Sequence, residues 1–160
     1  MLKKIVAAAA LAVMASSSFA AAPGTLYGGL DLGSTKVDGI SDRETSAGGF
    51  VGYNFHQNFA LEGGFRRLAS YDIAGEDLTI DQTALSVVGS VPLNQGFNVY
   101  GRLGYNYLKA DSRFGSDNDS GVLYGVGLGY NFSPTVAGRV EVQKPSSDST
   151  NVSVGVAFQF

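Results

Sequence analysis

The chain ends in Val152-Ser153-Val154-Gly155-Val156-Ala157-Phe158-Gln159-Phe160, where large apolar residues alternate strictly with small or polar ones. Successive side chains of a β-strand point to opposite faces, whereas the apolar residues of an amphipathic helix recur every three to four positions. The period of two therefore predicts a strand. One of its faces is wholly apolar, and the other carries only small or polar side chains.

The same alternation recurs through the rest of the chain, and helical spacing never replaces it. On the apolar side we place Leu26, Leu30 and Leu32 in one segment, and Val51, Tyr53 and Phe55 in the next. We expect eight strands of about ten residues, a length that crosses a bilayer at a tilt. Their ranges are 25–34, 46–55, 59–68, 83–91, 97–109, 122–132, 135–144 and 152–160.

The second face distinguishes two β architectures, because a soluble β-sandwich shows the same alternation as a membrane barrel. A surface exposed to water usually carries many Lys and Glu residues, but here charges are few, mixed in sign and set among small residues. That composition suits a narrow barrel lumen, with the apolar face toward lipid. The six charges that we place in the lumen are Asp31, Glu62, Arg66, Arg102, Arg139 and Glu141.

The first twenty residues have the three parts of a secretory signal. Met1 to Lys4 is positively charged, an apolar run of eleven residues spans 5–15, and Ser18-Phe19-Ala20 is a small-x-small cleavage site. A spanning helix needs about 20 apolar residues, so this run is too short for one. We therefore expect a signal peptide over 1–20 and one barrel domain over 21–160.

Composition excludes several classes of function. Without Lys3 and Lys4 the chain has 9 basic and 14 acidic residues, a net charge of −5, which argues against binding to nucleic acid. There is no Cys, and His56 is the only His, so thiolate chemistry and a His-cluster metal site are both excluded. We expect no cofactor.

The connections alternate in length, and this orients the barrel. Short turns at 56–58, 92–96 and 133–135 should face the periplasm, whereas the longer polar segments 35–45, 69–78, 110–120 and 145–150 should lie outside the cell. Aromatic residues gather near the short turns, as in an interfacial girdle: Tyr53, Phe55, Phe59, Phe97, Tyr130, Phe132, Phe158 and Phe160. Weaker candidates for a second girdle at the outer end are Tyr105, Tyr107 and Tyr124.

An internal repeat supports the arrangement. Gly52-Tyr53-Asn54-Phe55 recurs 77 positions later as Gly129-Tyr130-Asn131-Phe132, and the same offset aligns Glu62 with Arg139. The offset corresponds to four strands, so the third and seventh strands should face each other across the lumen. We therefore predict that Glu62 and Arg139 approach each other, directly or through one intermediary.

With these features the chain resembles the small outer-membrane barrels of the OmpA/OmpX type. The resemblance implies a monomer in the outer membrane of a Gram-negative bacterium, delivered by periplasmic chaperones and inserted by the barrel-assembly machinery. It also implies that the C-terminal strand is the assembly signal, through Val152, Val154, Val156, Phe158 and Phe160. No peptidoglycan-binding domain follows the barrel, and the outer loops are short for an adhesin, so neither of those family roles is expected.

Enzymatic activity is not expected. Acyl chemistry by a Ser nucleophile needs a general base beside the hydroxyl, but His56 falls in a short turn and no Ser lies beside it within that turn. Asp117 and Asp119 lie in a Gly/Ser/Asn-rich loop and lack a full set of calcium ligands.

Three functions then remain open: a structural or surface-interaction barrel, which we favour; a small, gated pore; and a barrel that binds ligands or host surfaces through its outer loops. The balanced lumen charges favour a closed interior over a selective pore, since an unpaired buried charge is costly. When the lipid-facing row of each strand, every second residue, is continued to the loop end, it predicts basic residues at the outer rim. There they would bind the phosphates of lipopolysaccharide. These are Lys36, Arg67, Lys109 and Lys144, and Arg43 has the same parity.

Overall fold

The computed structural model describes residues 22–37, 43–73, 76–112 and 115–160, so the expected signal peptide lies outside the described residues. Nearly all of the described chain is β-strand, and none of its helices is both long and apolar enough to cross a membrane. The strands are β1 (Thr25–Val37), β2 (Arg43–His56), β3 (Phe59–Ile73), β4 (Glu76–Pro92), β5 (Phe97–Ser112), β6 (Gly115–Ser133), β7 (Val136–Ser146) and β8 (Ser149–Gln159). A single 3-10 turn, η1 (Asn94–Gly96), joins β4 to β5.

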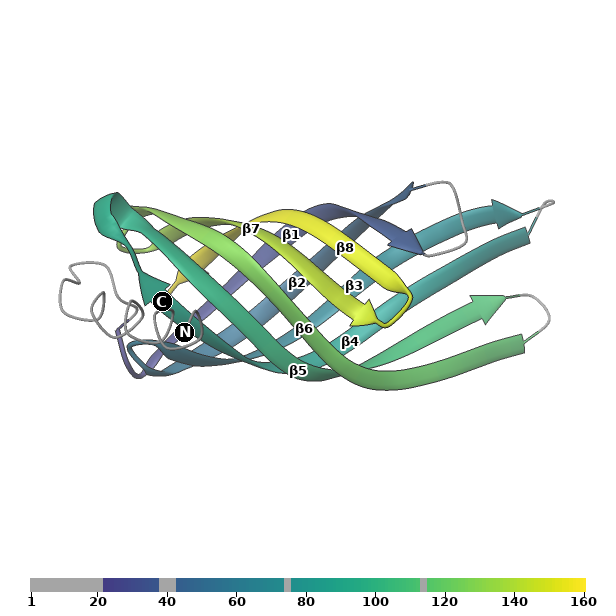
Figure 1. Ribbon diagram of the computed structural model, residues 1–160, viewed down its shortest axis with the longest axis horizontal. Helices are drawn as coiled ribbons and strands as arrows, with labels where there is room; N and C mark the ends of the chain where they lie inside the picture. Colours follow the sequence, from purple (N-terminus) through teal and green to yellow (C-terminus); the bar gives the residue numbers. More distant parts are fainter. Residues whose placement is uncertain (1–21, 38–42, 74–75, 113–114) are drawn as a thin grey trace, which may run out of the picture.

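The eight strands form one closed antiparallel barrel, as the alternation predicted. Each strand pairs with the next, and β8 closes the barrel on β1, in a register that runs from Tyr27 opposite Gln159 to Val37 opposite Ser149 (Figure 1). Closure removes the unpaired edges that an open sheet would present. Every backbone hydrogen bond can then be made within the wall, which a strand in lipid requires.

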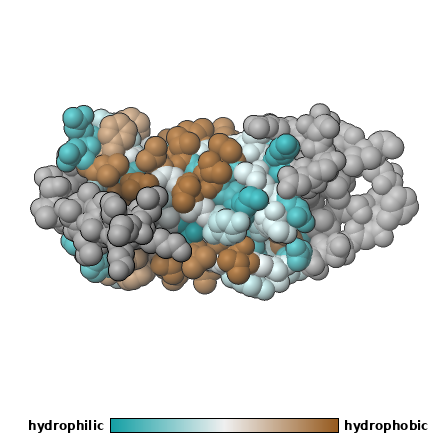
Figure 2. All heavy atoms as spheres, viewed as in Figure 1, coloured by the Kyte–Doolittle hydropathy of each residue, from teal (hydrophilic) through white to brown (hydrophobic). Residues whose placement is uncertain are grey.

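The outer face of the wall is apolar. The outward side chains of the predicted alternating segments are exposed, among them Leu30 at 73%, Leu103 at 63% and Val154 at 60% of their surface. On the visible side of the molecule these side chains form a hydrophobic band around the middle of the barrel (Figure 2). Large apolar side chains facing outward over a polar interior are the pattern of a barrel in lipid.

The strands are longer than the sequence pattern predicted. Segments 69–78 and 110–120, expected as loops, lie almost wholly in β3, β4, β5 and β6, which continue to pair up to Ile73–Glu76 and Ser112–Gly115. Alternation marks a strand only where one face meets lipid and the other meets the lumen. The sequence of these outer segments is polar and does not alternate, so the period of two did not reveal that the hairpins continue there.

The two copies of the internal repeat share a structural detail. The β2–β3 pairing shifts register between Asn54 and His56, and the β6–β7 pairing shifts between Asn131 and Ser133. Both are bulges directly before a short turn, and Asn54 and Asn131 are 77 positions apart. The repeated sequence therefore forms the same hairpin end in both halves of the barrel.

Candidate functional site: the barrel lumen

The structure brings together, inside the barrel, all six charged residues that the sequence placed there. They come only from the odd-numbered strands: Asp31 from β1, Glu62 and Arg66 from β3, Arg102 from β5, Arg139 and Glu141 from β7. All six are shielded from solvent, and the Glu62 and Glu141 side chains are each only 1% exposed.

Contacts between these groups form one chain in which the sign of the charge alternates. Arg66 donates from Nε to Asp31 Oδ1 (3.0 Å) and from Nη2 to Oδ2 (2.7 Å), a bidentate pair. Arg139 bridges Asp31 (3.4 Å) and Glu62 (2.9 Å), and the latter is the contact predicted from the repeat. Arg102 in turn bridges Glu62 and Glu141, with its Nε 2.8 Å from Glu141 Oε1. Every charge therefore has an opposite charge beside it, as burial requires.

Three aromatic residues that were not among the predicted lumen residues flank this six-charge network. The Tyr27 hydroxyl donates to Glu62 Oε2, and the Tyr100 hydroxyl to Glu141 Oε2, both at 2.9 Å. The Arg139 guanidinium lies 3.3 Å from the centre of the Phe50 ring, a cation–π contact. Parity gave a signal for the tyrosines, because Tyr27 and Tyr100 lie an even number of residues before Asp31 and Arg102. Because large apolar residues were expected on the lipid-facing side, the two tyrosines were not predicted to lie in the lumen.

Beyond the network, toward the outer end, neutral polar side chains fill the lumen. Asn151 donates to Thr35 Oγ1 (2.8 Å) and Ser46 Oγ (2.6 Å), and its own oxygen accepts from Arg66 (2.8 Å). Leu123 is 1% exposed and adds an apolar side chain to this packed layer. A cavity of about 20 Å³ borders the network here, room for about one water molecule.

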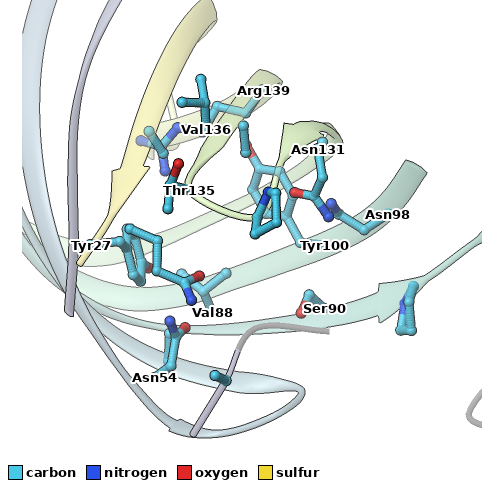
Figure 3. Close-up of a pocket in the computed structure, with 18 of the residues that line it drawn as sticks. Tyr27, Asn54, Val88, Ser90, Asn98, Tyr100, Asn131, Thr135, Val136 and Arg139 are labelled. Carbon is cyan, nitrogen blue, oxygen red and sulfur yellow. The ribbon is translucent and has the colours of Figure 1, made fainter. Parts of the chain in front are cut away.

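The other end of the lumen, at the short turns, is open. A cavity of about 360 Å³ lies there, with Glu62 and Arg139 at its floor and Tyr27 and Tyr100 in its walls. Figure 3 shows amide and hydroxyl side chains spaced around it, among them Asn54, Asn98 and Asn131. The network therefore divides the lumen into a packed outer half and an open inner half.

The basic residues expected at the outer rim do not point into the lumen. Lys36, Arg67 and Lys109 are exposed on the outward face, and Lys144 is half-buried with its Nζ 3.4 Å from the Ser147 carbonyl oxygen. Arg67 donates to Asp81 (2.9 Å), which also lies opposite Lys109 in the sheet. The Arg43 side chain, like those of Asp72, Glu76, Asp77 and Asp117, lies outside the described side chains.

The C-terminal strand presents its apolar residues to the outside. Val152, Val154, Val156 and Phe158 are exposed, and Phe160 is 80% exposed. The Phe160 amide donates to the Leu26 carbonyl (2.8 Å), so the last residue is still attached to β1. All five apolar side chains of the predicted assembly signal therefore face outward.

His56 is the last residue of β2, beside the turn to β3. It is exposed, its Nδ1 accepts from the Asn58 amide (3.2 Å), and its ring packs against Phe59. Within the described residues, no group of three or more His, Cys, Asp or Glu side chains is placed to hold a metal ion.

Comparison with known proteins gives one family match. The family model described as "Outer membrane protein beta-barrel domain" matches residues 5–160, nearly the whole chain. No curated protein matches the sequence significantly.

Several solved structures share the fold. Ail of Yersinia pestis, in complex with the heparin analogue sucrose octasulfate, is 19% identical and has a TM-score of 0.61; the alignment covers 87% of this chain and 100% of that one. The N-terminal β-barrel domain of Pseudomonas aeruginosa OprF is 16% identical, with a TM-score of 0.62 and coverage of 86% and 99%. Neisserial surface protein A is 17% identical, with a TM-score of 0.64 and coverage of 84% and 97%.

Proposed function

Because the chain belongs to the outer membrane protein beta-barrel family and lies in a Gram-negative outer membrane, we propose that it is a non-conducting, non-enzymatic barrel with a structural and surface-interaction role. The apolar outer band anchors the barrel in lipid, and the outer rim contacts the headgroups of neighbouring lipids. The small pore and the loop-mediated binder are the competing functions.

The observation that carries this proposal is the six-charge network across the lumen. A conducting path needs water-filled space along the whole axis, but Glu62 and Glu141 are buried and Asn151 is fully buried just beyond them. The interior of an eight-stranded barrel is just wide enough to be filled by side chains or to hold one small ligand, and at the network it is filled by side chains. Ions would have to separate paired charges in a low-dielectric interior, which is costly.

Conductance in planar bilayers tests the proposal. We expect no stepwise current from the purified, folded barrel, while a porin inserted into the same bilayer gives its usual openings. Openings that scale in number with the inserted barrels would instead support the pore.

We further propose that the outer rim binds phosphate groups of lipopolysaccharide through Lys36, Arg67, Lys109 and Lys144. Ammonium and guanidinium groups pair strongly with phosphate, and near the interface a lipid-facing cation costs only about 0–1 kcal/mol. The similar barrel Ail was solved with a heparin analogue, which is a polyanion. Asp81 should weaken phosphate binding at this rim, because it already pairs with Arg67.

Replacing the four basic residues with Gln should weaken lipopolysaccharide binding without unfolding the barrel, and Asp81→Asn should strengthen it by releasing Arg67. Asp119→Asn is the matched control, since it changes the net charge equally at an exposed outer site away from Arg67. Equal binding by the quadruple variant and the parent would contradict the proposal, as would equal gains from both Asp→Asn changes.

The route to the membrane completes the proposal. We propose that residues 1–20 are removed after export, that periplasmic chaperones carry the chain, and that the assembly machinery reads β8. Mass spectrometry of the outer-membrane form should find Ala21 at its N-terminus. An intact Met1 on the inserted protein would contradict cleavage.

A further inference from the structure

The inner half of the lumen, at the short turns, is open. The interior of an eight-stranded barrel is either filled by side chains or just able to hold one small ligand. Here the outer half follows the first pattern, whereas the inner half encloses about 360 Å³, within the range of small-molecule sites. The cavity opens at the short turns, toward the periplasm.

Two glycines keep this space open. Tyr27 lies opposite Gly52 and Tyr100 opposite Gly127 in the sheet. A Cβ added at Gly52 would lie 2.1 Å from Tyr27 Cζ, and one added at Gly127 would lie 2.4 Å from Tyr100 Cζ. Both rings therefore sit in the space above a glycine of the next strand, against the barrel wall. Their hydroxyl bonds to Glu62 and Glu141 hold them there.

The charge of the cavity selects against ions. Among the lining residues that the structure describes, only Glu62 and Arg139 are charged, and they pair with each other at 2.9 Å. Arg139 also contacts Asp31 and Phe50, so its guanidinium is already shared among several partners. A charged solute would meet no uncompensated opposite charge at the floor.

The rest of the lining offers neutral hydrogen-bonding groups beside aromatic and small apolar surface. Asn54, Asn98 and Asn131 line the cavity with amides, and an amide carries two donor hydrogens and an acceptor oxygen, so Asn54 keeps further capacity beside its bond to Thr25 Oγ1 (2.9 Å). Ser90 and Thr135 add hydroxyls. Aromatic walls with amide and hydroxyl groups match a compact molecule that has several hydroxyls and an apolar ring face.

We propose that this cavity, the inner lumen site, binds a neutral sugar of about monosaccharide size from the periplasm. Sugar hydroxyls bond to the ring of amides, and the C–H face of the sugar ring packs against Tyr27 or Tyr100. The site is separate from the outer rim and from the closed network, so it stands or falls independently of the function proposed above.

Solution NMR of the folded barrel in detergent micelles tests the proposal, with glucose and N-acetylglucosamine at millimolar concentrations as probes. We expect saturable shifts of the side-chain amide signals of Asn54, Asn98 and Asn131 with at least one of the two sugars. Glucosamine and glucuronate, a cation and an anion of similar size, should bind at least tenfold more weakly. Equal or tighter binding of either charged probe would overturn the assignment, as would unshifted amide signals with both neutral sugars.

Cavity-filling variants locate the binding. Ala157→Leu and Ala137→Leu each place a larger side chain in the cavity and should abolish the shifts, whereas Ala47→Leu adds the same atoms on the exposed outward face and should leave them intact. Heat-modifiable gel migration shows which variants are folded. Unchanged sugar binding by a folded Ala157→Leu or Ala137→Leu protein would overturn the proposal.

Discussion

Arg139 shows how much of the lumen depends on one side chain. It contacts Asp31 on β1, Phe50 on β2 and Glu62 on β3, so a residue of β7 fixes the opposite wall of the barrel. Buried ion pairs contribute little to stability relative to apolar packing, but removing one partner leaves an uncompensated buried charge. The network as a whole therefore adds little to the free energy of unfolding, but the loss of one of its members is costly.

A double-mutant cycle at Glu62 and Arg139 should reveal this coupling. We expect Glu62→Ala to lower the free energy of unfolding by about 3–5 kcal/mol, because it removes one of the two carboxylates beside Arg139 and beside Arg102 and leaves an excess of buried positive charge. Glu62→Ala with Arg139→Ala should destabilise less than the sum of the single changes, by about 0.5–3 kcal/mol. Urea unfolding in lipid vesicles measures both values.

The exposed pair Arg67–Asp81 is the matched control for that cycle. The Arg67 side chain is 57% exposed, so its coupling to Asp81 should fall within about 0–1 kcal/mol. Additive losses at Glu62 and Arg139 would mean that the 2.9 Å contact carries no energy.

Gly52 should be intolerant of any side chain. Gly52→Ala places a Cβ within the Tyr27 ring, so we expect a loss of about 1–3 kcal/mol from overpacking. Gly63→Ala is the matched control, because a Cβ at Gly63 meets nothing within 4 Å. Thermal unfolding of the two variants compares them, and equal midpoints would contradict the close approach of Tyr27 to Gly52.

At this scale the sequence predicted orientation better than contact. Parity alone identified the six lumen charges, because a one-residue slip would have placed them in lipid. The repeat added the Glu62–Arg139 pair. The cation–π contact of Phe50 could not be predicted. Parity with Val51 places the Phe50 ring on the lumen side, but its contact with Arg139 depends on the register across the strands from β2 to β7.

At the scale of the element, β8 combines a structural role with a proposed signal. The Phe160 side chain is exposed while its amide holds β1, so a change at this side chain leaves the barrel pairing intact. Phe160→Asp should lower the amount of assembled barrel several-fold without blocking export. Quantifying heat-modifiable protein in outer-membrane fractions measures this amount.

Phe132→Asp is the control for general loss of apolar surface, because Phe132 is 66% exposed at the same end of the barrel. Equal assembly defects in Phe160→Asp and Phe132→Asp would indicate lost membrane contact rather than a lost recognition signal.

The existence of all eight strands could be predicted, but their outer limits could not. Between the girdles, alternate residues face lipid and the lumen, so apolar residues alternate with small or polar ones in the sequence. Toward the outer end, β5 and β6 pair as far as Ser112 and Gly115, through polar sequence that does not alternate in this way. The outer ends of the strands therefore could not be read from alternation.

At the scale of the whole molecule, the odd-numbered strands supply the charges, while inward residues such as Phe50, Gln82, Leu123 and Asn151 come from the even-numbered strands. Residues of alternate strands lie at similar depth in a tilted barrel, so the six charges meet in one layer. The packed layer and the open cavity on either side of it give the two ends of the molecule different properties.

The orientation of the barrel can be tested because the chain contains no Cys. Short turns of outer-membrane barrels face the periplasm. Gln57→Cys places a thiol in the exposed β2–β3 turn, and Ser147→Cys places one in the exposed β7–β8 connection at the opposite end. A maleimide too large to enter porins should label Ser147→Cys in intact cells, but Gln57→Cys only after the outer membrane is permeabilised. The reverse pattern would place the basic rim in the periplasm and the inner lumen site at the cell surface. It would therefore contradict the lipopolysaccharide proposal and the periplasmic source of the sugar, while the lining of the cavity would be unchanged.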